Sequence, residues 1–177
     1  MGFAVVQRIV GFLIAGSSLM MLPPVGVTLL YHDGTATLFL VSAAILLGLG
    51  LLVYFPVRNV RDELRLRDGF LIVVSAWLVV ALVGAVPFVL LTSPQLGYVD
   101  AVFESMSGLT TTGATIVTNI DAQPRAVLYY RQQLQWLGGM GIIVLAIAIL
   151  PLLGIGGMQL YRAEYPGPLK DAKLTPR

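Results

Sequence analysis

The distribution of charged residues is the feature that most constrains the fold of this chain. Lys, Arg, Asp and Glu are absent from four long stretches, residues 9–31, 34–57, 69–99 and 132–161. Crossing a ~30 Å hydrocarbon core requires about 20 apolar residues of helix, and each stretch exceeds that length. Only 11% of the residues are charged, against roughly 25% in a soluble domain. These observations exclude the soluble globular classes and predict an all-α polytopic membrane protein.

The composition also narrows the possible chemistry. The sequence has no cysteine and a single histidine, His32, which excludes a disulfide framework, a thiol nucleophile and a multi-histidine metal site. The net charge is only +2, and the basic residues lie beside the predicted spans. They are therefore interpreted as topology signals, and we expect a lipid bilayer but no nucleic acid as a partner.

The N-terminal part, residues 1–57, is predicted to form a two-helix hairpin. Its spans cover about 5–31 and 35–55, and a short polar turn joins them. A kink is expected at Pro23 and Pro24, because proline removes a backbone donor and clashes with the preceding turn.

Basic residues set the predicted orientation. They are concentrated in an Arg-rich connector, residues 58–69, and in the tail, residues 154–177. The positive-inside rule then places the connector, the tail and both termini in the cytoplasm.

Residues 70–153 are predicted to form a pore unit, with outer helices over 70–91 and 134–153. Between them, apolar residues recur at helical spacing over 99–109, a helix of about 16 Å or half a membrane. The Thr/Gly segment 110–115 follows, and a polar stretch leads out. This order is the outline of a re-entrant pore loop entering from outside, since irregular backbone at membrane depth must be buried or line a watery path.

The Thr/Gly segment could replace the water shell of a cation by backbone carbonyls. Gly113 is the candidate for the backbone angles closed to other residues. The half-helix would also direct its partly negative C-terminal end, near residues 107–108, toward a cation. The residues alone leave open that the segment is an ordinary polar loop.

Two runs of residues resemble a known family. Residues 103–114, FESMSGLTTTGA, resemble the first pore loop of the TrkH/KtrB potassium-transporter superfamily. Residues 130–146, YRQQLQWLGGMGIIVLA, are similar to the TrkH family in particular. The resemblance implies that Thr111 and Thr112 contact K⁺ and that Gly113 is the filter glycine. Thr110, Ala114 and Glu104 would flank the filter.

The resemblance further implies four helix–loop–helix repeats in one polypeptide, each giving a quarter of a potassium selectivity filter. The implied location is the bacterial inner membrane, with no cofactor besides the transported K⁺. Implied partners are the remaining pore repeats, a possible second copy in a dimer, and a TrkA-type nucleotide-binding cytoplasmic subunit. Because 177 residues hold one such repeat, the chain is interpreted as the N-terminal portion of a longer transporter.

Other interpretations remain open at this point. Several copies could assemble, or the chain could be a non-conducting membrane scaffold. An intramembrane enzyme is the remote alternative, since residues 105–108 lack the leading glycine of a serine nucleophile motif and His32 lies in a turn.

Individual residues carry two interpretations each. Glu104 could lend a negative field to the filter, or it could be a structural acid paired with Arg131 or backbone N–H groups, which we favour. Gly138, Gly139 and Gly141 are expected to allow close helix packing, with a hinge or cavity as the alternative.

Overall fold

The structure is a computed structural model that describes residues 3–60 and 66–152. Two compact units divide the chain, Met1–Met140 and Gly141–Arg177. Of the second, the structure describes only the continuation of helix α7, so the predicted tail, residues 154–177, lies outside the described residues. Every regular element within the described ranges is helical.

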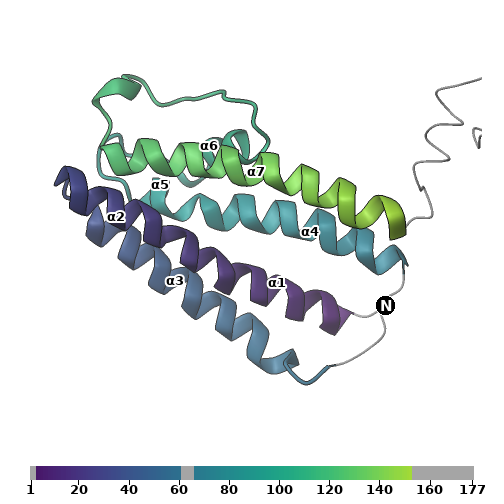
Figure 1. Cartoon of the computed structure of the whole chain (residues 1–177). Helices are drawn as coiled ribbons and strands as arrows, with labels where there is room; N and C mark the ends of the chain where they lie inside the picture. The colour runs from purple at the N-terminus through teal and green to yellow at the C-terminus, as the bar shows by residue number, and fades with distance from the viewer. Residues whose placement is uncertain (1–2, 61–65, 153–177) are drawn as a thin grey trace, which may run out of the picture. The chain divides into compact units, whose positions relative to one another are not determined.

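The hairpin begins with helix α1 (Phe3–Ser17), the 3₁₀ turn η1 (Ser18–Met21) and helix α2 (Leu22–Tyr31), which together give one membrane-long segment (Figure 1). The helix changes to the 3₁₀ turn η1 just before the prolines at which a kink was predicted, and Pro23 and Pro24 occupy the first turn of α2, where a missing N–H is tolerated. Pro24 leaves the Met20 carbonyl without its helical donor. The Gln133 side-chain amide donates to that carbonyl at 3.0 Å.

Helix α3 (Ala36–Tyr54) returns against α1 and ends in the 3₁₀ turn η2 (Phe55–Val57). Two glycines set how closely the helices approach. A Cβ on Gly11 would lie 2.7 Å from the Tyr54 nitrogen, and one on Gly50 would overlap the backbone of Ala15. The contact therefore relies on small residues, as is usual between membrane helices.

Helix α4 (Leu66–Gly84) and the short helix α5 (Val86–Leu90) form the first outer helix of the pore unit. They cover the helix predicted over 70–91, with a break between Gly84 and Val86. At the break, the Phe88 N–H donates to the Ala85 carbonyl at 3.0 Å, and Pro87 supplies no N–H. The Tyr130 hydroxyl donates to the Gly84 carbonyl at 2.9 Å, so this interrupted helix is again completed by a side chain from α7.

The half-helix predicted over 99–109 is helix α6 (Tyr98–Leu109). An extended segment and the 3₁₀ turn η3 (Ile120–Ala122) then lead to helix α7 (Arg125–Leu152). Figure 1 shows this segment running back from the end of α6 to the start of α7, at the same end as the α2–α3 turn.

Helix α7 begins at Arg125, well before the span predicted over 134–153. The sequence-based boundary followed the uncharged stretch, whereas the first turns of α7 are amphipathic. Their buried positions follow one helical face, at Ala126, Val127, Tyr130 and Leu134. Arg125 lies away from this face and Arg131 pairs with Glu104, so neither charged residue interrupts the helix.

The core joins the hairpin to the pore unit. Phe39 of α3 and Phe88 of α5 both contact Tyr130 of α7, with ring centroids 5.7 and 5.4 Å apart. All three side chains are fully buried. Such aromatic contacts stabilise beyond the area that they bury, and they fix α7 against both preceding parts of the first unit.

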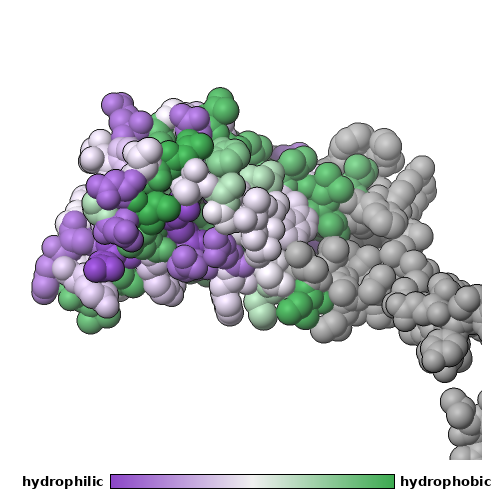
Figure 2. All heavy atoms as spheres, turned by 90° about the horizontal axis from the view of Figure 1, so that it is seen from above, coloured by the Kyte–Doolittle hydropathy of each residue, from purple (hydrophilic) through white to green (hydrophobic). Residues whose placement is uncertain are grey.

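Three described helical segments are long and apolar enough to cross a membrane: Ala4–Tyr31, Ala36–Val57 and Leu71–Leu90. The predicted fourth span falls on α7, where most side chains beyond Gly141 lie outside the described residues. Large apolar side chains such as Leu30 and Leu52 remain exposed on the hairpin, as lipid contact requires. Figure 2 shows hydrophilic side chains concentrated toward the end that holds the α2–α3 turn. The fold is that of an all-α polytopic membrane protein.

Candidate functional site

The half-helix α6 ends in a hydrogen-bonded cap that shapes the Thr/Gly segment. The Thr112 N–H donates to the Ser107 carbonyl at 3.0 Å, and the Thr111 N–H donates to the Gly108 carbonyl at 2.9 Å. This pair of bonds is a Schellman motif, in which the residue after the cap is usually glycine in the left-handed region. Here Thr111 takes that conformation, with φ 56°, which is uncommon for a β-branched residue.

The cap turns the N–H groups of residues 110–113 toward α6. The Thr110 N–H donates to Met106 at 2.8 Å, and the Gly113 N–H donates to Ser107 at 3.5 Å. Within the described ranges, the carbonyls of residues 110–113 accept no hydrogen bond. The carbonyls of Ser107 and Gly108, at the helix end predicted to point toward a cation, accept hydrogen bonds from the N–H groups of residues 111–113. The carbonyls without donors are therefore those of residues 110–113, which follow the end of the helix.

The predicted filter residues lie together in this segment and are exposed. Thr110 to Ala114 are all solvent-accessible in the described unit. The Thr110 hydroxyl donates to the Met106 carbonyl and contacts the Thr112 hydroxyl, both at 2.8 Å. Gly113 has φ 76°, and no atom would lie within 4 Å of an added Cβ. Glycine is therefore required there by backbone conformation and not by lack of space.

Glu104 holds the second half of the loop, residues 115–117, through hydrogen bonds. One of its carboxylate oxygens accepts the Thr115 hydroxyl at 2.5 Å and the Ile116 N–H at 2.7 Å, with a longer bond from the Val117 N–H at 3.4 Å. The other oxygen pairs with the Arg131 guanidinium of α7. The Glu104 side chain is 0% exposed, so both of its oxygens are fully used in a buried site.

These contacts settle how Glu104 is bound. The partners favoured from the sequence, Arg131 and backbone N–H groups, are both present. The carboxylate faces the back of the loop and is neutralised by a cation. The geometry therefore assigns it a structural contact, and Arg131 is turned into the protein with it.

Close packing behind the loop depends on glycine. A Cβ on Gly138 would overlap the Leu109 carbonyl, and one on Gly108 would lie 3.0 Å from the Leu134 Cβ. The close-packing interpretation is confirmed for Gly138. It is not supported for Gly139, where nothing lies within 4 Å of an added Cβ.

Sequence reasoning missed the role of Asp33, which lies in the α2–α3 turn. Its carboxylate accepts the Thr35 N–H and hydroxyl at 3.2 and 2.8 Å. It also accepts the Ala126 N–H at 2.9 Å, so it caps the first turn of α7. Burial raises the pKa of Asp33, but these hydrogen bonds together bring it below its ordinary value of 3.8.

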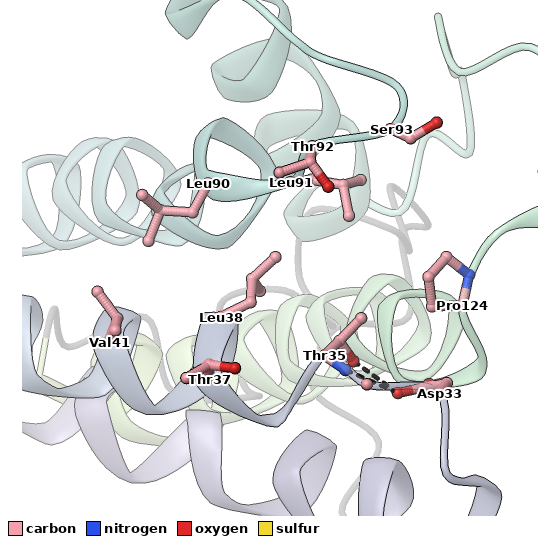
Figure 3. Close-up of a pocket in the computed structure, with 11 residues that line it drawn as sticks. Asp33, Thr35, Thr37, Leu38, Val41, Leu90, Leu91, Thr92, Ser93 and Pro124 are labelled. Atoms are coloured by element: carbon pink, nitrogen blue, oxygen red, sulfur yellow. Dashed lines mark hydrogen bonds between the residues drawn. The ribbon is translucent and has the colours of Figure 1, made fainter.

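An open cavity of about 510 Å³ lies beside this cap, between the start of α3 and the end of α5 (Figure 3). Asp33, Thr35 and Leu38 line one side, and Leu90 to Ser93 line the other. Figure 3 shows the Asp33 carboxylate bonded to Thr35 and not free toward the cavity.

The chemistry of the site is that of backbone and hydroxyl oxygens. Among the residues described, no group of His, Cys, Asp and Glu side chains could hold a metal ion. Four consecutive carbonyls without donors, at the end of a half-helix, can instead bind a weakly held cation. The fold and this site define a helical membrane protein in which a half-helix leads into a segment of exposed residues with carbonyls that lack donors.

Comparisons with known proteins identify the family. The family model for TrkH, described as a cation transport protein, matches residues 37–177. The chain belongs to the TrkH family. This membership replaces the intramembrane-enzyme alternative, because the family consists of transporters.

Similar proteins and a solved structure agree with this assignment. The chain is 58% identical over 177 residues to the Trk system potassium uptake protein TrkH of Halomonas elongata, covering 100% of this chain and 37% of that protein. The corresponding protein of Escherichia coli K12 is 54% identical, with the same coverage of 100% and 37%. The crystal structure of the potassium transporter TrkH from Vibrio parahaemolyticus matches with a TM-score of 0.82 and 52% identity, over 93% of this chain and 35% of that one. The chain thus spans about a third of the length of these relatives.

Proposed function

We propose that this chain contributes one part of a potassium pathway across the membrane. The observation that carries the proposal is the run of carbonyls at residues 110–113, which have no donors in the described structure while their N–H groups bond to α6. Backbone oxygens in such a run can replace the hydration shell of K⁺. The similar proteins of Halomonas and Escherichia are named as potassium uptake proteins, which supports K⁺ as the ion.

Within this proposal, Thr111 and Thr112 supply carbonyls to K⁺ and Gly113 holds the backbone angle that continues the run. Thr110 and Ala114 flank these residues. Glu104 holds the following segment of the loop through hydrogen bonds from Thr115 and Ile116. The loop forms one quarter of a selectivity filter. Three further pore repeats of a longer transporter would supply the other quarters.

The proposed setting is the bacterial inner membrane, with both termini in the cytoplasm. Basic residues of the connector and tail support this orientation. A TrkA-type nucleotide-binding subunit on the cytoplasmic side and a second transporter copy are the proposed partners. A membrane scaffold without transport activity is the competing function.

The test uses a chimera in which these 177 residues replace the matching segment of the Halomonas elongata relative. Cells lacking their own potassium uptake would be assayed for rubidium uptake with and without competing sodium. A serine at position 113 must adopt the backbone angle φ 76°, which costs about 1–3 kcal/mol in strain. Gly113→Ser is therefore expected to reduce selectivity for rubidium over sodium by about tenfold.

Gly48→Ser is the matched control. Gly48 lies on α3, and nothing is within 4 Å of an added Cβ there. We expect this variant to retain uptake and selectivity. A Gly113→Ser chimera with unchanged selectivity would count against the filter assignment. A chimera that reaches the membrane but takes up no rubidium would favour the scaffold.

A further inference from the structure

Ser107 makes three contacts to the loop, and the transport proposal does not use the one made by its hydroxyl. Its carbonyl accepts the N–H groups of Thr112 and Gly113, at 3.0 and 3.5 Å. Its hydroxyl donates to the Ala114 carbonyl at 2.6 Å. Ser107 is 6% exposed, whereas its partners at residues 112–114 are exposed.

The carbonyl that Ser107 binds is the one directly after the free run. Residues 110–113 have carbonyls without donors among the described residues, whereas the Ala114 carbonyl has a short bond to a buried hydroxyl. Beyond it, Glu104 takes the hydroxyl of Thr115 and the N–H of Ile116. The run of carbonyls without donors is therefore interrupted after Gly113, and the side chain that holds the Ala114 carbonyl belongs to α6.

We propose that Ser107 is a positioning residue that sets the number of carbonyls available to the ion, by holding the Ala114 carbonyl on the α6 side of the loop. This inference rests on the proposed potassium pathway. Ion preference depends on the number and field strength of the coordinating carbonyls. Release of the Ala114 carbonyl would add a ligand beside Gly113 and loosen the backbone there, which lowers the preference for K⁺-sized ions.

The test compares Ser107→Thr with Ser107→Val in the chimera described above. The two side chains have nearly the same shape, and only threonine keeps the hydroxyl, so steric effects cancel between them. Membrane abundance, maximal rubidium uptake, the apparent KM for rubidium and the inhibition by sodium would be measured for both. Loss of one buried hydrogen bond corresponds to a change of about 2–10-fold.

We expect Ser107→Val to show about 2–10-fold weaker discrimination against sodium and a higher KM than Ser107→Thr, at equal membrane abundance. Equal selectivity and KM in the two variants would overturn the proposal, as would a difference confined to abundance. The Gly113→Ser chimera is run in parallel. If Gly113→Ser lowers selectivity and the Ser107 pair does not differ, only the role of Ser107 fails. If Gly113→Ser also has no effect, the potassium pathway itself fails.

Discussion

Replacement of Glu104 by glutamine tests whether this buried carboxylate holds the loop or acts on the ion. The side chain is 0% exposed and its partner Arg131 is 15% exposed. A glutamine keeps one carbonyl oxygen to accept hydrogen bonds from Thr115 and Ile116. Its NH₂ group would face the Arg131 guanidinium, and no hydrogen bond can form there because both groups are donors. The main consequence is therefore an unpaired, largely buried cation.

The expected magnitude follows from this geometry. Removing one partner of a buried ion pair costs about 3–5 kcal/mol, a large share of the ~5–15 kcal/mol that typically separates folded from unfolded states. Arg131→Gln is expected to be similarly destabilising, since it leaves the Glu104 carboxylate unpaired. The double variant removes both charges, so its effect should fall about 1–3 kcal/mol short of the sum of the single effects.

Equilibrium unfolding of the four detergent-solubilised chimeras would give this coupling, and rubidium uptake would be measured on the same samples. A double variant that is less destabilised than the sum of the single variants, with uptake proportional to the amount of folded protein, supports a structural role. A field role predicts that uptake stays low in both the Glu104→Gln variant and the double variant, because the negative charge is lost in each. Strictly additive unfolding energies would refute the ion-pair reasoning.

Two further predictions concern packing and capping. Gly138→Ala places a Cβ onto the Leu109 carbonyl and should lower stability by about 3 kcal/mol or more. Gly139→Ala is the control and should change stability little, because the space beside Gly139 is open. Equal thermal midpoints of the two variants would contradict the packing argument. Asp33→Ala removes the cap on Ala126 and should lower stability by about 0.5–2 kcal/mol. Because the pKa of Asp33 is lowered, the contribution of its carboxylate to stability is complete above pH 3.8 and declines below it. Asp33→Asn should therefore make stability less dependent on pH in the acid range. An unchanged pH profile of stability would be inconsistent with the cap.

The elements that the sequence predicted well are those governed by local spacing. The uncharged stretches and the apolar positions of residues 99–109 were sufficient to predict a half-helix, because helical periodicity appears directly in the order of residues. The Schellman cap was not predictable in the same way. Its left-handed position normally indicates glycine, and here Thr111 occupies it.

Contacts between distant segments were the other source of error. Asp33 reads as an ordinary turn residue, and its bond to Ala126 links positions 93 residues apart. The early start of α7 was missed because polar residues precede its apolar stretch. Pro23 and Pro24 indicated the first helix break, but nothing local indicates that Gln133 and Tyr130 complete the two interrupted helices. Partner identity depends on tertiary packing, which a single sequence does not display.

The loop's hydrogen bonds show where its conformation originates. Over residues 110–117, the partners from outside the loop all belong to α6: Met106, Ser107, Gly108 and Glu104. Among the described residues, helix α7 contributes Arg131, which holds Glu104, and Gly138, which admits the Leu109 carbonyl. The hydrogen bonds that shape the carbonyl run thus come from one short helix, while α7 supports that helix from behind. Substitutions in α6 should therefore alter ion preference most, whereas substitutions at Arg131 or Gly138 should alter stability and the amount of folded protein first.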